Sequence, residues 1–488
     1  MMVLRFSALD HLVFALFAAT LLALGFSARL RDNTVLQFLA AGRRLTLPMF
    51  VATLVSTWYG GILGVGESVS YFGLGSWAML GLPYYVFAAV YALWFAERVR
   101  GAEQISLPER LETRFGRPMA LVGAGLVFLL ALPAAHVLML GVLVQAFTGW
   151  GLLPSIVVGA VVGTLFLYKG GLLADARVSL LAFAMMYVGF AVMVAACVSR
   201  EAPWSAWAAL QPKTLLAWDG GMGPLYVLSF FLLGVWTLVD PGFHQRVASA
   251  ASPAVGRAGV LLSIACWFVF DLLSMSTGMY AMAWLQPKPE TGLQIFPAFG
   301  EQMLPAGLKA LFVCGMAGTI VSAMVGYTLV SGATLGRDVL ARLRRGMDDR
   351  RVKAWTRVGF AASTLLAILL AAWIESVVSL WYAWAGAVVG ALLVPVSLSY
   401  GLLWRTRCPG VWMAASSALA FLVSLAWMVH GFRTGNTSLD VQVLGHTFSL
   451  GTVLPGLAVS LLGIALGEAA ARRSSHGRSV GAAAGREG

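Results

Sequence analysis

Apolar runs long enough to cross a membrane recur along almost the whole chain. A helix needs about 20 apolar residues to span the hydrocarbon core of a bilayer, so thirteen such runs take up about 260 residues. Only short connections remain, with no room for a large soluble domain. The chain is therefore predicted to be an all-α membrane protein of about thirteen transmembrane helices. The runs fall at roughly 9–27, 46–73, 77–97, 118–147, 153–172, 178–198, 222–242, 257–284, 305–335, 355–374, 376–404, 409–430 and 447–468.

Composition supports a membrane protein and excludes other classes. Of the 488 residues 59% are hydrophobic and 11% are charged, whereas soluble chains carry about a quarter charged residues. The net charge of +12 would suggest nucleic-acid binding in a soluble protein, but membrane proteins collect Lys and Arg in cytoplasmic loops. The expected partners are the lipid bilayer and a small-molecule solute, not nucleic acid. The four cysteines are scattered without a CxxC pair, so neither a disulfide nor a metal cofactor is expected.

The distribution of positive charge predicts the orientation. With the N-terminus outside, the loops predicted to be cytoplasmic carry 27 of the 33 Lys and Arg residues, whereas a random split would be nearly even. This bias predicts thirteen crossings, an external N-terminus and a cytoplasmic C-terminus in a bacterial-type inner membrane. The first run has the length of a signal peptide, but no small-residue cleavage site precedes Ala28–Arg31. It is therefore expected to be retained.

Glycines interrupt the second apolar run near its middle. Gly60, Gly61, Gly64 and Gly66 lie within seven residues of Leu47–Gly75, and each costs about 1 kcal/mol in a helix interior. Unwound backbone at membrane depth is tolerated where it lines a cavity, and transporters use it to hold ions and substrate. The alternative interpretation is close helix packing through small residues such as Gly60 and Gly64.

A second interruption is predicted five runs later. Gly223–Arg246 contains Gly234 and ends its apolar part at Asp240–Gly242. Interrupted helices five spans apart are typical of an inverted repeat of five plus five helices. The predicted organisation is a peripheral first helix at 1–35, a transporter core at 36–404 with repeats at 46–198 and 222–404, two peripheral helices at 405–468 and a disordered cytoplasmic tail at 469–488.

Four segments resemble motifs of the sodium:solute symporter family, which includes bacterial proline, pantothenate and sugar symporters. They occur in the family's order and on the expected side of the membrane. The resemblance covers roughly residues 35–400 and implies the leucine-transporter-type inverted-repeat fold. The third segment departs from the family pattern, with Ala251 in place of Lys. The segments are Gln37–Arg44 (QFLAAGRR), Ile105–Gly116 (ISLPERLETRFG), His244–Arg257 (HQRVASAASPAVGR) and Met316–Asp338 (MAGTIVSAMVGYTLVSGATLGRD).

The resemblance also implies a sodium site between the second and ninth spans. Its carbonyl donors on the second span would be Leu54 and Thr57. On the ninth span, Ser322 matches the family's Ser, Ala323 takes the place of the adjacent Ser or Thr, and Thr319 matches the carbonyl-donating Ala. Thr319 lies one turn before Ser322, so it is a candidate for the missing oxygen. The departure at Ala323 leaves proton coupling and facilitated transport open beside sodium coupling.

Polar and aromatic residues near the two interruptions are candidates for solute binding. Glu67 would bind a cationic group or relay a proton, unless it lies near the outer interface in water. Asp271 is the deepest carboxylate, and either a proton carrier or a structural acid. His136 is expected to be a core histidine, and Asp175 and Asp240 to be interfacial. The predicted solute-binding residues are Trp58, Tyr59, Gly60, Gly61, Glu67, Tyr85, Trp236 and Thr237.

These features predict a secondary active transporter. It would import a small solute by cation symport, with sodium as the expected ion and access alternating between the two sides of the membrane. An intramembrane enzyme is disfavoured because the six histidines are dispersed without an HxxxxD or HExxH pair. A transporter-like membrane sensor remains an alternative, and its signalling partner would be a separate chain.

Overall fold

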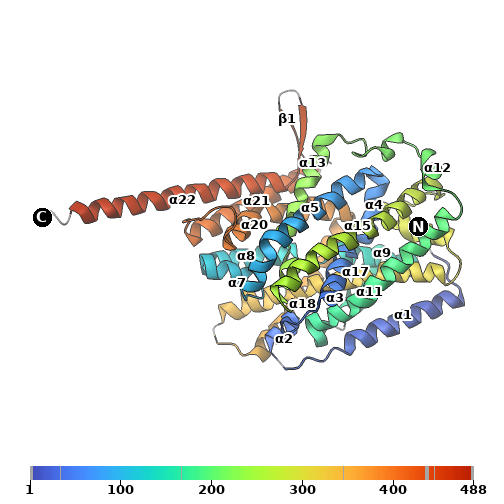
Figure 1. Ribbon diagram of the computed structural model, residues 1–488, viewed down its shortest axis with the longest axis horizontal. Coiled ribbons are helices and arrows are strands. Elements are labelled where there is room, and N and C mark those ends of the chain that lie inside the picture. The colour runs from blue at the N-terminus through green and yellow to red at the C-terminus, as the bar shows by residue number, and fades with distance from the viewer. Residues whose placement is uncertain are drawn as a thin grey trace.

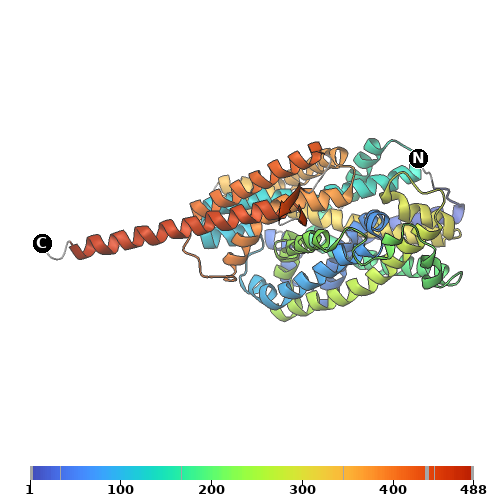
Figure 2. The ribbon, with the colours of Figure 1, turned by 90° about the horizontal axis from the view of Figure 1, so that it is seen from above.

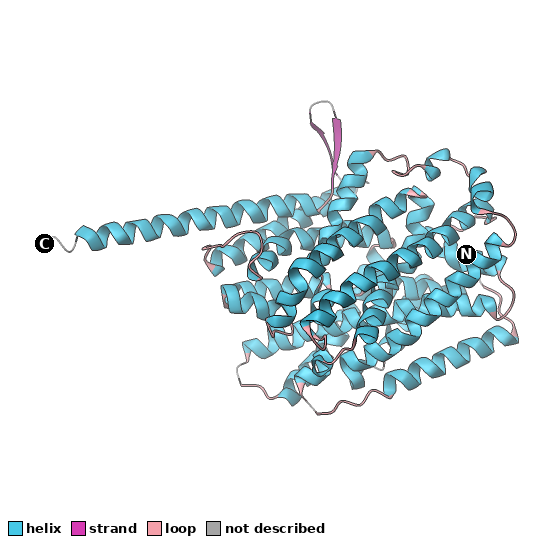
Figure 3. Cartoon of the chain, in the orientation of Figure 1, coloured by secondary structure: helices cyan, strands magenta, loops and turns pink. Residues whose placement is uncertain are grey.

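The computed structural model describes residues 4–32, 34–165, 167–344, 346–434, 439–443 and 446–484. Helices dominate this part of the chain (Figures 1 and 3). Twelve of them, several formed by two consecutive segments, are long and apolar enough to cross a membrane. Their segments are α1 (Ala8–Phe26), α3 and α4 (Leu47–Trp58 and Ile62–Phe72), α5 and α6 (Leu82–Val90 and Ala96–Gly101), α8 and α9 (Arg117–Leu130 and Ala134–Thr148), α11 (Leu167–Val198), α13 and α14 (Pro224–Leu233 and Pro241–Ala248), α15 (Pro253–Trp284), α17 (Leu308–Ala333), α18 (Asp349–Trp373), α19 and α20 (Val377–Ser379 and Gly386–Ser399), α21 (Gly410–Thr434) and α22 (Val453–Ala484).

Shorter elements connect these spans. The described residues form one sheet, a two-stranded β-hairpin between α21 and α22. The shorter elements are α2 (Val35–Ala40), α7 (Leu107–Phe115), α10 (Leu152–Thr164), α12 (Pro203–Ala208), α16 (Ile295–Met303), β1 (Leu439–Val443) and β2 (His446–Leu450).

The fifth predicted span is shorter than expected. Helix α10 has 13 residues, and α11 begins at Leu167 and bends at Gly171, whose φ is 53°. The predicted boundary between spans at about 172–178 therefore lies inside α11. The N and C termini nevertheless lie at opposite ends of the bundle (Figures 1 and 2). Helix α10 is apolar but is not among the twelve helices long enough to cross a membrane.

The C-terminal region differs from its prediction in two respects. Residues 447–450 belong to the β-hairpin, so the last span begins at Val453 and not at 447. Helix α22 then continues past Glu468 to Ala484 and projects beyond the bundle (Figures 1 and 2). Ala has the highest helix propensity, and the Ala-rich sequence after Glu468 extends the helix where a disordered tail was predicted. Residues 485–488 of the predicted tail lie outside the described part of the chain.

Both predicted helix interruptions are present. A 3₁₀ turn, Tyr59–Gly61, separates α3 from α4, and a second one, Gly234–Leu238, follows α13. Helix α14 restarts with Asp240 as its N-cap, whose carboxylate accepts a hydrogen bond from the amide of Phe243 at 2.8 Å. The interruptions divide spans two and seven, which is the spacing of five spans that the sequence predicts.

The centre of the bundle is built around the first interrupted span. Helix α3 packs against α11, α15 and α17, and α11 also packs along α17. Helix α1 lies against α11 and α17, whereas α21 and α22 pack together and against α20. Residues far apart in the chain, from spans two, six, eight and nine, therefore meet around the Tyr59–Gly61 turn.

Candidate functional site

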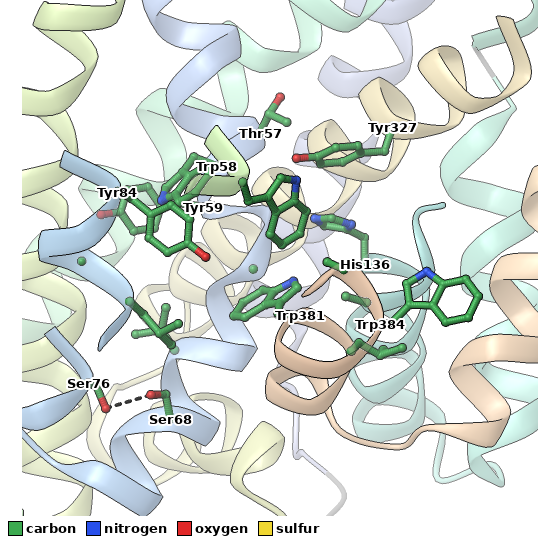
Figure 4. Close-up of a pocket in the computed structure, with 18 of the residues that line it drawn as sticks. Thr57, Trp58, Tyr59, Ser68, Ser76, Tyr84, His136, Tyr327, Trp381 and Trp384 are labelled. Carbon is green, nitrogen blue, oxygen red and sulfur yellow. Dashed lines mark hydrogen bonds between the residues drawn. The ribbon is translucent and has the colours of Figure 1, made fainter. Parts of the chain in front are cut away.

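A cavity of about 1060 Å³, counting the space open to solvent, lies where the two interruptions meet. Trp58, Tyr59 and Gly61 line it from the first interruption, and Trp236 lines it from the second. Aromatic rings surround it (Figure 4). A mostly apolar lining with a few polar groups is typical of small-molecule sites. Further lining residues include Thr57, Ser68, Ser76, Trp77, Gly81, Tyr84, Leu130, His136, Asp271, Met275, Tyr327, Trp381 and Trp384.

Close packing and interruption of the helix occur together at the first glycine cluster. A Cβ atom placed on Gly60 would lie 2.0 Å from the Cβ of Ala323, and one on Gly61 would lie 2.4 Å from the ring of Trp381. Gly64 meets the same ring at 2.7 Å. The two interpretations of these glycines are therefore compatible, because the 3₁₀ turn also packs closely against Ala323 of span nine and Trp381 of span eleven.

Asp271 of α15 presents its carboxylate to the cavity. The hydroxyl of Tyr59 donates to Oδ1 at 2.6 Å, and the hydroxyl of Tyr85 donates to Oδ2. A Cβ atom on Gly81 would lie 2.8 Å from Oδ2 and 2.7 Å from the ring of Trp77, so only glycine leaves room there for the carboxylate. Asp271 thus links the first interruption to the third span within the wall of the cavity.

Several polar atoms at the cavity have no hydrogen-bond partner within the protein. They are Nδ1 of His136 and Nε1 of Trp236, two lining residues, and the hydroxyl of Thr237 behind the lining, all buried. The ring of His136 stacks on Tyr327, with centroids 5.2 Å apart. Buried polar groups are nearly always satisfied, so these unpaired atoms are unusual. His136 and Trp236 line the cavity, but their unpaired nitrogens are covered by protein, so a ring would have to rotate to present its nitrogen to a solute.

Three serine hydroxyls from three spans meet just below the first interruption. The Ser322 hydroxyl lies 3.1 Å from that of Ser56 and 2.8 Å from that of Ser179. Ser56 and Ser179 each donate to a carbonyl of their own helix, Ala52 and Asp175 respectively. Their remaining lone pairs face Ser322, which makes an oxygen-rich cluster suited to a hard cation.

The predicted ion-site residues take different positions around this cluster. Ser322 lies at its centre, but the Thr319 hydroxyl donates to the carbonyl of Met316 in its own helix, at 2.9 Å. Ala323 packs against Gly60, and Leu54 is buried in the core. The third hydroxyl comes from Ser179 of α11 and not from Thr319. Sequence comparison missed Ser179 because it lies on a helix outside the predicted pair of spans.

A buried ion pair joins Asp175, one turn before Ser179 on α11, to Arg246 of α14. The guanidinium of Arg246 lies 3.2 Å from Oδ2 of Asp175 and donates to the Thr57 hydroxyl at 2.7 Å and to that of Thr53 at 3.2 Å. Asp240 accepts from Tyr327 at 2.9 Å. Arg246, Asp175 and Asp240 are at most 1% exposed.

Asp175 and Asp240, which were expected near the cytoplasmic interface, are buried in protein. The seventh span was expected to end at 242, with Arg246 in a cytoplasmic loop, whereas α14 carries the helix inward to Ala248. That continuation places Arg246 inside the bundle, opposite Asp175.

Glu67 does not line the aromatic cavity, which is lined by Trp58. Its carboxylate accepts hydrogen bonds from the amides of Val377 and Val378, at 3.0 and 3.1 Å. It borders a second cavity of about 940 Å³, counting open space, together with Lys288 and Glu375. Glu67 therefore caps α19 and ties it to α4.

The other predicted solute-binding residues divide into two groups. Trp58, Tyr59, Gly61 and Trp236 line the aromatic cavity. The other three lie behind this lining. Gly60 packs against Ala323, and the hydroxyl of Tyr85 donates a hydrogen bond to Asp271. The hydroxyl of Thr237 is buried without a hydrogen-bond partner.

Some lining residues gave little signal in the sequence. Trp381 and Trp384 are one turn apart on the eleventh span, a spacing that places both on one helix face. Trp77 begins a π-helical turn, Trp77–Gly81, and such turns are frequent at functional sites.

Among the described residues, no three His, Cys, Asp or Glu side chains are grouped so as to hold a metal ion.

Comparison with known proteins points to one family. The sequence model of the sodium:solute symporter family matches residues 38–409. The chain is similar to the high affinity choline transporter 1 of Homo sapiens, with 24% identity over 286 residues, which is 54% of this chain and 48% of that protein. The chain thus spans about half the length of this curated relative.

Solved structures share the fold. A Na⁺-coupled sialic acid symporter in a substrate-bound outward-open state superposes with a TM-score of 0.74 at 14% identity, covering 95% of this chain and 98% of that one. MHP1, a nucleobase-cation-symport-1 family transporter in a closed conformation with bromovinylhydantoin bound, gives 0.58 at 14% identity, covering 91% and 96%.

The predicted fold class is confirmed by these superpositions, and the family resemblance is confirmed by a match over most of the chain. The family and both structural neighbours are transporters, and the apolar helices make the chain a multi-pass membrane protein. The chain belongs to the sodium:solute symporter family.

Proposed function

We propose that this protein imports a small solute by symport with sodium. The observation that carries the proposal is the meeting of both helix interruptions at one cavity, directly above a cluster of three hydroxyls. Interrupted helices at the bilayer midplane form the substrate and ion sites of many secondary transporters. The solute would lie among Trp58, Tyr59 and Trp236.

Sodium would bind at the hydroxyl cluster. Ser322 supplies one oxygen, and Ser56 and Ser179 turn theirs toward it. Backbone carbonyls of α3 near Leu54 and Thr57 would complete the coordination, as the family pattern implies. Membership of a sodium:solute symporter family and the fold shared with a Na⁺-coupled symporter support sodium as the ion.

The hydroxyl cluster also suggests how ion and solute binding are coupled. Its three serines belong to α3, α11 and α17, which are separate spans around the first interruption. An ion bound to all three would hold α3 in one position and so order the cavity above it. A ligand shifts such an equilibrium only by its differential affinity for the two states, and the ion would favour the outward-open one.

Proton coupling is the second candidate. Asp175 and Asp240 are buried carboxylates, and Asp175 lies one turn before Ser179 of the hydroxyl cluster. Ionisable groups inside membrane proteins frequently carry protons. The clustering of Lys and Arg on one side supports an external N-terminus and a cytoplasmic C-terminus in a bacterial-type inner membrane.

Uptake into proteoliposomes with separately imposed sodium and proton gradients tests this function. We expect an inward sodium gradient to drive accumulation of a solute and a proton gradient alone to drive none. Accumulation under the proton gradient alone would favour proton coupling. Equilibration without accumulation under either gradient would indicate facilitated transport and contradict symport.

A further inference from the structure

The charge of the aromatic cavity is one-sided. Among its described lining residues, Asp271 is the single acid, and none is Lys or Arg. Asp271 is 8% exposed, and its hydrogen-bond donors are the uncharged hydroxyls of Tyr59 and Tyr85. The positively charged Arg246 is engaged elsewhere, by Asp175. A buried carboxylate without a cation is costly, so the cavity favours a ligand that brings a positive charge.

The rings around the cavity favour the same charge. Trp58 packs edge-on against Tyr84, with centroids 4.4 Å apart, and Trp77 and Trp381 also line the space. Trp and Tyr faces attract cations through the ring quadrupole, most strongly where water is excluded, and aromatic cages of this kind recognise quaternary ammonium groups. Unlike a carboxylate alone, an aromatic wall favours a weakly hydrated organic cation over a sodium ion.

The unpaired donors supply the remaining specificity. Nε1 of Trp236 is a donor without an acceptor, and Nδ1 of His136 has no partner. Both residues line the cavity, and their nitrogens, which are now covered, would bond a polar group on the same ligand after a rotation of the rings. The lining therefore provides a carboxylate and aromatic faces for a positive end, together with hydrogen bonds for a polar end.

We propose that the transported solute is an organic cation, a small molecule with an ammonium group and a polar tail, and that Asp271 is its counter-ion. This substrate class rests on the proposed transport function for its biological meaning, but binding tests it independently.

The test compares choline with its uncharged isostere 3,3-dimethylbutan-1-ol. Isothermal titration of the purified wild-type protein in saturating sodium chloride gives both dissociation constants without any mutation. We expect choline to bind at least about tenfold more tightly than the isostere, because each 1.4 kcal/mol of binding energy is a factor of ten. Equal or tighter binding of the isostere, or no measurable binding of choline, would overturn the proposal.

Two variants then locate the charge effect. We expect Asp271→Asn to bring the dissociation constant of choline to within about threefold of that of the isostere, leaving the isostere unchanged. Glu97→Gln removes a surface carboxylate, 58% exposed at the side chain, and should retain the wild-type preference. Loss of sodium dependence in Asp271→Asn with an unchanged preference for choline would assign Asp271 to the inorganic ion and overturn the proposal.

Uptake measurements separate this inference from the transport function. Sodium-driven accumulation of a neutral solute, with no preference for the cation, would leave the symport function standing and sink the substrate class. Selective binding of choline without accumulation of any solute under any gradient would support the substrate class and contradict the symport function.

Discussion

Arg246 and Asp175 form an ion pair of 3.2 Å in the interior of the bundle, with at most 1% of either side chain exposed. Oδ2 of Asp175 accepts hydrogen bonds from Arg246 and Thr53, whereas Oδ1 has no hydrogen-bond partner. The carboxylate therefore depends on the guanidinium for its compensation. Removing one partner of a buried pair leaves an uncompensated charge, which costs about 3–5 kcal/mol.

We expect Arg246→Gln and Asp175→Asn each to lower the free energy of unfolding by about that amount, measured by denaturant titration in detergent. The double variant should lose less than the sum of the two, because the two residues are in contact. Arg257→Gln is the control, since its pair with Glu97 is exposed and worth about 0–1 kcal/mol. Additive losses in the double variant would show that the pair does not act as a unit.

Substitution at Ser322 should weaken sodium binding. Its hydroxyl is the centre of the serine cluster. Removing an oxygen that binds a charged ligand costs about 1.5–3 kcal/mol of binding free energy. We expect Ser322→Ala to raise the sodium concentration for half-maximal uptake by about tenfold or more.

Thr319→Val is the matched control, on the same helix and one turn away. Its hydroxyl bonds its own helix, so the sodium requirement should change by less than about twofold. A larger effect at Thr319 than at Ser322 would contradict a sodium site centred on Ser322 and would make the Thr319 hydroxyl the ligand.

The contact between Gly60 and Ala323 should tolerate no added methyl group. In Gly60→Ala the new Cβ would lie 2.0 Å from that of Ala323, and overpacking of this kind costs about 1–3 kcal/mol. We expect the variant to lose stability and uptake, and Ala323→Gly in the same chain to restore both.

Gly125→Ala controls for the loss of glycine itself. A Cβ there would meet nothing within 4 Å, so the variant should be neutral or more stable by up to about 1 kcal/mol. Failure of the Gly60→Ala, Ala323→Gly double variant to recover would mean that the contact with Ala323 is not the decisive one, and that the added Cβ clashes with the ring of His136 at 3.0 Å and the carbonyl of Thr319 at 3.1 Å.

Glu67 should act on stability more than on solute affinity. Its carboxylate accepts from Val377 and Val378 at the start of α19, so Glu67→Ala removes a helix cap and should cost about 0.5–2 kcal/mol. Glu67→Gln keeps one acceptor oxygen and should leave the half-saturating solute concentration within about threefold of wild type. A tenfold or larger increase in a folded Glu67→Gln protein would show that Glu67 binds the solute.

Length and charge patterns predict the fold of this chain well because the bilayer imposes them. Apolar runs locate the spans and glycines locate the interruptions, so Trp58, Tyr59 and Trp236 were found from sequence. The short length of helix α10 was not predicted, because the apolar run continues past its end at Thr164 into the start of α11.

Residues from the other spans are harder to predict for a physical reason. A helix buried among other helices is apolar on all sides, so its sequence does not reveal which face meets a cavity. Ser179, Trp381 and Arg246 illustrate this. Each is separated from its contacts by many residues, and only the packing of α11, α14 and the eleventh span against α3 and α4 brings them to the site.

The lone carboxylate of the cavity also has an electrical consequence. A membrane potential acts on each elementary charge with about 2.3 kcal/mol per 100 mV. An ionised Asp271 in an empty cavity feels that field as access passes from one side of the membrane to the other. The same carboxylate paired with a bound cation adds no charge of its own. The step in which the empty carrier returns would then depend on voltage, and its rate would be set by the resting potential of the cell.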